Sequence, residues 1–233
     1  MSAGGIYVRT LRTCASNAGF LLTLGALVFV PLGLLSALAD RAEGIHVSHA
    51  GALGDLTTIG LAAGFLAQAG TALIGEVFYS GAVGLTLAGR GGTQPSLIEV
   101  ARSLSYGRLI AVDVVFVAGT LLGMALLVLP GVVFFTWFAL AGPLVEIEGE
   151  GVGSALRHSR ALVRGRFWTV LGVLGPITLA SEAIADAALP AAHTLLGNPF
   201  VSDWLGESAA NVLLSPLYAV AAVLITLELS GRR

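Results

Sequence analysis

The sequence predicts an all-α, polytopic membrane helix bundle, and three observations support this fold class. The chain has 233 residues, of which 56% are hydrophobic and only 11% are charged, whereas a soluble domain carries about 25% charged residues. The apolar residues gather in six long runs, and almost all of the arginines lie between alternate runs. We therefore expect a single integral membrane domain over residues 1–233, with six transmembrane helices.

The six apolar runs are the predicted spans. A spanning helix needs about 20 residues. The second run is long enough that it must tilt, break at a glycine or project beyond the bilayer, and the fourth is short. The first is longer than the apolar core of a signal peptide, about 7–15 residues, so we expect it to remain as a span. The runs cover residues 18–38, 56–87, 109–129, 131–147, 167–187 and 209–227.

The dipeptide Pro130-Gly131 separates the third and fourth runs. This pair is a strong turn former, and it predicts a tight helical hairpin there; one long kinked helix is the alternative. The glycine pairs Gly60–Gly64 and Gly119–Gly123 have the spacing that brings membrane helices close together. They predict either packing inside the protein or a homo-oligomer.

The arginines predict the orientation in the membrane. Loops on the cytoplasmic side of a membrane carry an excess of basic residues. Only Arg41 falls in a loop of the opposite set, so both termini are expected in the cytoplasm. The other arginines are 9 and 12 before the first span, 90, 102 and 108 after the second, 157, 160, 164 and 166 after the fourth, and 232 and 233 after the sixth.

Three of the arginine-bearing segments have the pattern of interfacial amphipathic helices. In residues 152–165, apolar residues follow helical spacing on one face, while Arg157, Arg160 and Arg164 lie on another. This pattern is typical of a helix that lies in the membrane interface, with its basic side toward lipid phosphates. Weaker versions at 97–108 and 6–18 predict three repeats, each of one interfacial helix and two spans, over about 6–96, 97–151 and 152–233.

The stretch PLVEIEGEGVGSALRHSRALVRGRFW, residues 143–168, resembles the hallmark of a known family. This is the six-span glycerophosphoryl diester phosphodiesterase membrane-domain family, with its mostly uncharacterised bacterial relatives. The resemblance implies a multi-pass protein of the bacterial cytoplasmic (inner) membrane. It implies no catalytic activity, because no segment here is long and polar enough to be a phosphodiesterase domain. The matching positions are Pro143, Glu146, Ala155, Ser159, Gly165 and Trp168.

Two acidic residues inside spans are candidates for an intramembrane polar site. Glu76 and Asp113 each lie within an apolar run, where an ionisable residue costs about 2.5–3.5 kcal/mol on insertion scales. They form either a site for a proton, cation or substrate, or structural carboxyl groups bonded to a neighbouring helix. Glu182 and Asp186 are expected as solvated acids at the outer end of the fifth span.

The sequence contains no recognisable catalytic constellation. It has no phosphate-binding glycine loop, zinc-protease helix or lipase-type serine elbow. His46 and His49 are three residues apart in a glycine-rich loop, which argues against a metal site, and His158 is expected to be solvated. We therefore expect no enzyme, no cofactor and no metal. The net charge of −2 gives no case for nucleic acid.

Two functions from different classes remain. The first is a membrane-organising module that binds anionic lipid headgroups, or a protein partner, through Arg157, Arg160, Arg164 and Arg166. Each basic residue near an anionic surface contributes about 1 kcal/mol. The second is a small transporter or permease-like unit that uses Glu76 and Asp113, since many transporters combine internal repeats with a site at the bilayer midplane.

Overall fold

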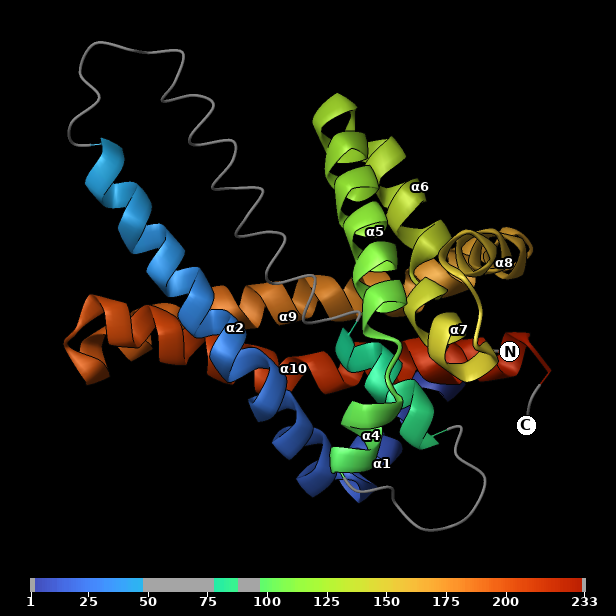
Figure 1. Ribbon diagram of the computed structural model, residues 1–233, viewed down its shortest axis with the longest axis horizontal. Coiled ribbons are helices and arrows are strands. Elements are labelled where there is room, and N and C mark those ends of the chain that lie inside the picture. The colour runs from blue at the N-terminus through green and yellow to red at the C-terminus, as the bar shows by residue number, and fades with distance from the viewer. Residues whose placement is uncertain (1–2, 48–77, 88–96, 232–233) are drawn as a thin grey trace.

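The computed structural model describes residues 3–47, 78–87 and 97–231. Every regular element in these ranges is an α-helix (Figure 1), which confirms the all-α class. Several predictions fall outside the described residues. These are Glu76, Gly60–Gly64, His49, Arg90, Arg232, Arg233 and the first part of the second span.

Three short helices correspond to the predicted amphipathic segments. They are α1 (Ala3–Ser16), α4 (Leu97–Ser103) and α8 (Val152–Arg164). Each is followed by a break of one or two residues and then by a long apolar helix. The third break includes a glycine, Gly165, whereas Gly19 and Gly107 lie inside the helices that follow the first two breaks.

Five of the described helical segments are long and apolar enough to cross a membrane, so the chain is an integral, multi-pass membrane protein. They comprise α2 (Ala18–Val47), α5 (Tyr106–Leu126), α6 with α7 (Val128–Phe138 and Ala141–Glu148), α9 (Phe167–Leu196) and α10 (Pro199–Leu229). The helix Phe78–Leu87 is the described end of the predicted second span. The short fourth run therefore has enough length when α6 and α7 are taken together.

The hairpin between the third and fourth runs is present, but its turn is not at Pro130-Gly131. The chain reverses at Leu127, whose φ of −166° and ψ of 142° are extended. Pro130 and Gly131 lie in the first turn of α6, where a proline loses no hydrogen bond because the N–H there has no partner in the helix. Gly123 and Gly131 are in contact, since a Cβ on Gly123 would stand 2.8 Å from the Gly131 nitrogen. Together with Gly119 against the Phe134 ring, this assigns the Gly119–Gly123 pair to internal packing.

A second proline explains why the fourth span is divided. Pro143 is the third residue of α7, and its missing N–H and bulky ring are incompatible with a helical bond to Ala139. The helix accordingly breaks at Ala139 and Leu140, between α6 and α7. The family-like proline thus sets the position of a break, in addition to closing the span.

The fifth and sixth helices are longer than the apolar runs predict. The link between α9 and α10 is only Gly197 and Asn198. Gly197 has φ of +65°, and the Asn198 side chain accepts a hydrogen bond from the Val201 N–H before Pro199 begins α10. A left-handed glycine and an asparagine cap stop one helix and start the next. Polar residues near the link are therefore helical, which a hydropathy pattern alone does not reveal.

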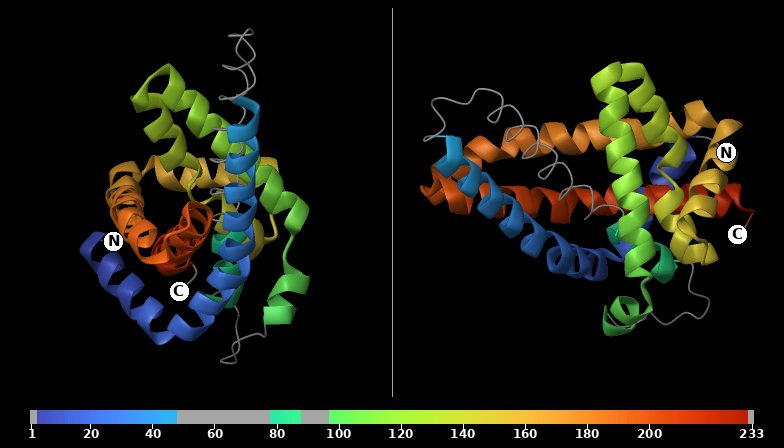
Figure 2. Two further views of the ribbon diagram at one scale, coloured as in Figure 1. Left: turned by 90° about the vertical axis from the view of Figure 1, so that its left-hand side faces the viewer. Right: turned by 45° about the horizontal axis from the view of Figure 1, so that its top comes forward.

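The helices form two crossing groups. The helix α2 packs against α10 and crosses the α9–α10 hairpin obliquely, while the α5–α6 hairpin stands across the same α9–α10 hairpin (Figures 1 and 2). The hydrophobic core lies where the two groups of helices meet, and the C-terminal half of α10 supplies much of it. This crossing places α7 and α8 beside the start of α5, where the candidate site is built (Figure 1).

Candidate functional site

The predicted basic residues lie on one exposed face of the α8 region. Arg157, Arg160 and Arg164 are exposed on α8, and Arg166 is exposed in the break that follows it. We call these four side chains the arginine face. The guanidinium of Arg160 lies 4.4 Å from the centre of the Trp137 ring, a distance at which a cation is attracted to an aromatic face.

The opposite side of α8 is covered by protein. Ala155, Ser159 and Val163 are fully buried, and α8 packs against α5, α6 and α7. The apolar stripe was expected to face lipid, but its most buried positions form a helix contact instead. The reason is the small size of Ala155 and Ser159, which lets α8 approach its neighbours closely. The arginine face is therefore held on a packed support.

Ser159 makes the polar contact that holds α8 in place. Its hydroxyl donates a hydrogen bond of 2.7 Å to the Trp137 carbonyl. That carbonyl lies just before the break between α6 and α7. A buried carbonyl without a partner is costly, so the family-like serine supplies a bond to a backbone group beside this break.

Glu146 connects α7 to the beginning of α5. Its side chain is 9% exposed and accepts a hydrogen bond of 2.9 Å from the Ser105 backbone N–H. Ser105 immediately precedes α5, so the carboxylate satisfies one of the free donors at that helix terminus. Nearby, the Arg108 side chain donates a 3.1 Å bond to the Gly149 carbonyl. These two hydrogen bonds join the α7 region to the start of α5, and both helices contact α8.

The remaining family-like positions complete the same joint. Gly165 ends α8 at the break before α9, and Trp168 is 79% exposed at the start of α9. Exposed tryptophan is enriched where a membrane helix crosses the lipid–water interface. Five of the six positions thus have structural roles at contacts or breaks among α5, α6, α7, α8 and α9, and Trp168 faces outward.

The arginine-bearing ends of the chain also meet. The Tyr7 hydroxyl of α1 donates a 2.8 Å bond to the Gly172 carbonyl near the start of α9. Arg9 forms an ion pair with Glu228 at the end of α10. Since α8 leads directly into α9, the arginines of α1 and of the arginine face lie toward the same end of the α9–α10 hairpin. This grouping is what the charge pattern predicts.

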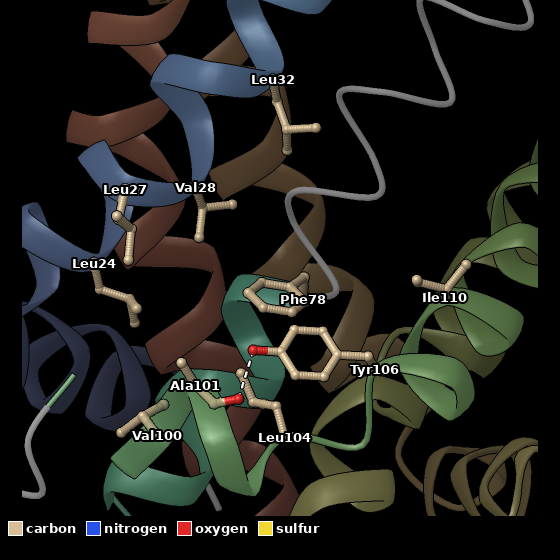
Figure 3. Close-up of a pocket in the computed structure, with 10 residues that line it drawn as sticks. All are labelled: Leu24, Leu27, Val28, Leu32, Phe78, Val100, Ala101, Leu104, Tyr106 and Ile110. Atoms are coloured by element: carbon tan, nitrogen blue, oxygen red, sulfur yellow. Dashed lines mark hydrogen bonds between the residues drawn. The ribbon is translucent and has the colours of Figure 1, made fainter. Parts of the chain in front are cut away.

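Asp113 is buried, with 1% of its side chain exposed, on the side of α5 that faces the protein. An apolar pocket of about 320 Å³ lies between α2, the helix Phe78–Leu87, α4 and α5 (Figure 3). Leu24, Phe78 and Ile110 point into it. Asp113 is not among the residues that line this pocket. The described structure therefore does not bring the predicted intramembrane acid to the pocket.

The helix α9 continues beyond the distal acids, past the predicted end of the fifth span. Glu182 and Asp186 are exposed near the middle of α9. Past them, His193 of α9 lies 2.9 Å from an Asp203 carboxylate oxygen of α10. These groups belong to the end of the hairpin away from the arginine face.

Cys14 is the free thiol of the chain, and it is half-buried on α1. Burial raises its pKa to about 11, and its sulfur lies 3.5 Å from the Pro216 carbonyl. Because the thiolate is the reactive form, burial of Cys14 opposes a role as a nucleophile.

One cluster of side chains near the arginine face is not predicted by the sequence pattern. His158 was expected to be solvated, but its Nδ1 atom lies 2.9 Å from a Glu150 oxygen and 3.2 Å from a Glu148 oxygen. The signal was the Glu-x-Glu sequence at the end of α7, followed by a histidine on the second turn of α8. It was hidden because α8 has to fold back before these side chains meet.

Comparison with protein-family models, curated proteins and solved structures gives no match for this chain.

Proposed function

We propose that the protein is a non-catalytic, multi-pass membrane protein that binds anionic lipid headgroups through the arginine face. The observation that carries the proposal is the set of four exposed arginines on α8 and its terminus, opposite a fully buried side. An amphipathic helix that is not packed against the protein loses conformational entropy when it becomes ordered on the membrane. Here Ser159 and Glu146 already hold the joint in place, so lipid meets a surface that is arranged beforehand.

The electrostatics support anionic lipid as the ligand. Each basic residue near an anionic bilayer surface contributes about 1 kcal/mol, so four contribute roughly 4 kcal/mol at low salt. Arginine suits this role because its planar guanidinium donates two parallel bonds to a phosphate. The exposed Trp168, two residues after Arg166, adds an aromatic side chain of the kind enriched at the interface.

The sequence pattern and the arginine positions also support a proposal for the membrane in which the protein resides and for its orientation there. We propose that the chain belongs to the glycerophosphoryl diester phosphodiesterase membrane-domain family, on the family-like positions described above. Its place is then the bacterial cytoplasmic (plasma) membrane, with both termini and the arginine face in the cytoplasm. The positive-inside rule and the meeting of α1 with the end of α10 support this orientation.

Lipid retention by the purified full-length protein tests the proposal. We expect native mass spectrometry, from micelles with equal phosphatidylglycerol and phosphatidylcholine, to show preferential retention of phosphatidylglycerol. The triple variant Arg157→Glu, Arg160→Glu, Arg164→Glu should reduce this preference at least about tenfold, because it replaces three attractions of about 1 kcal/mol each. The matched variant with lysine at all three positions keeps the charge and should retain most of it.

Unchanged retention in the charge-reversed variant, with the fold intact by circular dichroism, would refute the lipid proposal. A protein partner would then be the occupant of the arginine face, and it would be sought by crosslinking from Arg157→Cys in intact cells.

A second candidate function, transport, is favoured by the burial of Asp113. Acids inside membrane helices commonly mark ion or substrate paths. Here Asp113→Asn and Glu76→Gln would abolish uptake or efflux while leaving phosphatidylglycerol retention unchanged. If both variants support normal flux in cells, the transport hypothesis fails.

A further inference from the structure

The Glu148, Glu150 and His158 side chains form a cluster with the donor set of a metal site. Glu148 ends α7, Glu150 lies in the link to α8, and His158 is on the second turn of α8. One ligand atom from each lies within 4.8 Å of the other two. The three side chains are only 14%, 21% and 32% exposed, respectively.

The distances fit a shared ion. A metal ion bound at about 2.0–2.1 Å to nitrogen and oxygen separates neighbouring ligands by about 3.0 Å in octahedral and about 3.4 Å in tetrahedral geometry. The His158 Nδ1 atom lies 2.9 Å from Glu150 Oε1 and 3.2 Å from Glu148 Oε2. Both His158 distances fall in or near that range. The ligand atoms of Glu148 and Glu150 lie within 4.8 Å of each other, so a bound ion would draw the two carboxylates together.

A second observation distinguishes this cluster from a set of surface acids. The other oxygen of Glu150, Oε2, has no accessible surface and no hydrogen-bond partner. An ionised carboxylate oxygen in that situation is costly. The single Nδ1 atom of His158 faces two carboxylates, and it cannot compensate the negative charge of both in a half-buried place. A divalent cation compensates that charge better than a single shared proton.

Within the described part of the chain, two neighbouring arginines are directed to other groups. The guanidinium of Arg108 bonds to the Gly149 carbonyl, and the Arg157 guanidinium lies toward Gly153. Neither is paired with the three side chains of the cluster in a salt bridge.

We infer that Glu148, Glu150 and His158 bind a divalent first-row transition-metal ion of the Zn²⁺ type. Imidazole together with carboxylates selects such ions over Mg²⁺ or Ca²⁺, which prefer oxygen ligands alone. The site joins the end of α7 to α8, so an ion there would brace the helix that carries the arginine face. The inference does not depend on lipid binding.

The test is Zn²⁺ titration of the full-length protein by calorimetry. The protein carries an affinity tag without histidine, is stripped with EDTA, and is placed in nanodiscs of phosphatidylcholine alone, which adds no anionic lipid. We expect one Zn²⁺ per chain and a rise in the thermal unfolding midpoint on binding. Loss of one ligand in His158→Asn or Glu150→Gln should weaken binding about 100-fold, at least as much as loss of an outer hydrogen bond to a ligand.

Two controls make the test specific. His193 is also paired with a carboxylate, but with only one, so His193→Asn should leave Zn²⁺ affinity unchanged. The double variant His46→Asn, His49→Asn should also bind normally. Folding is checked by gel filtration, and if His158→Asn does not fold, Glu150→Gln and Glu148→Gln carry the test. The inference is overturned if the wild type binds no Zn²⁺, if the ligand variants bind as it does, or if either control abolishes binding.

Discussion

The α5–α8 region and the part of α9 beyond Ile177 are both helical and apolar, yet they differ in how closely they pack against the rest of the protein. In α5–α8, helices meet backbone to backbone at Gly123 and Gly131, and Glu146 and Ser159 bond across buried joints. In α9, all of the buried residues lie within its first eleven positions, ending at Ile177. Beyond that, α9 contacts the protein mainly through α10. The contrast shows that fixed geometry is concentrated around α8, where the candidate sites lie.

The largest effect is expected from Gly123→Val, which should force the two helices of the α5–α6 hairpin apart. The added Cβ would stand 2.8 Å from the Gly131 backbone nitrogen, and backbone atoms cannot move aside as a side chain can. We expect the free energy of unfolding, measured by SDS titration in mixed micelles, to fall by about 3 kcal/mol, the upper end for overpacking. Gly172→Val on α9, where a Cβ meets nothing within 4 Å, controls for the helix propensity of valine. Equal losses in the two variants would mean that the close approach of Gly123 to Gly131 does not hold the α5–α6 hairpin together.

The second prediction concerns Glu146. Glu146→Ala removes the acceptor of the Ser105 N–H and leaves that donor buried, which costs about 2 kcal/mol of unfolding free energy. Glu146→Gln keeps a carbonyl oxygen within reach and should recover most of the loss. The comparison is Glu182→Ala on α9, an exposed acid, which should leave the same titration unchanged. If Glu146→Gln is as unstable as Glu146→Ala, charge rather than hydrogen bonding is responsible.

The joint around Glu146 also shows what a sequence can and cannot predict. The apolar runs and arginines predict the class, the short amphipathic helices and the grouping of basic segments at one end, because these follow from local periodicity and total charge. Pro143 and Ser159 were found as family-like positions, but their partnership at the Trp137 carbonyl was not. It depends on α8 folding back onto α6, which is a tertiary event.

Two predictions were wrong, the turn at Pro130-Gly131 and the solvated His158, and in both cases the reason is a contact made only in the tertiary structure. Pro130-Gly131 was expected to form the turn because the pair favours turns locally, yet a proline is equally acceptable in the first turn of a helix. The actual reversal at Leu127 is imposed by packing of Gly123 on Gly131. His158 was assigned to solvent because its neighbours in sequence are arginines, whereas its partners, Glu148 and Glu150, reach it only after the chain bends.

The third prediction compares a buried serine with an exposed serine on the same helix, α8. Ser159→Ala removes the bond to the Trp137 carbonyl and should cost about 1 kcal/mol of unfolding free energy, the usual net value for a buried hydrogen bond. Ser154→Ala, five residues earlier on α8, removes only a local, exposed bond to the Gly151 carbonyl and should cost much less. Hydrogen exchange at the start of α7 should also accelerate in Ser159→Ala alone. If both variants exchange alike, Ser159 does not hold the joint.

The smallest effect is expected at the distal end. His193 and Asp203 are 40% and 48% exposed, so solvent screens their attraction, and exposed pairs contribute about 0–1 kcal/mol. Asp203→Asn should therefore change the unfolding free energy by less than about 0.5 kcal/mol, with no change in phosphatidylglycerol retention or Zn²⁺ affinity. Raising the salt concentration from 0.05 to 0.5 M should remove even this difference, because a screened surface pair loses its remaining attraction. A large loss in Asp203→Asn would mean that the end of the α9–α10 hairpin is held by specific side-chain bonds after all, and that the α5–α8 region is not where the fixed geometry is concentrated.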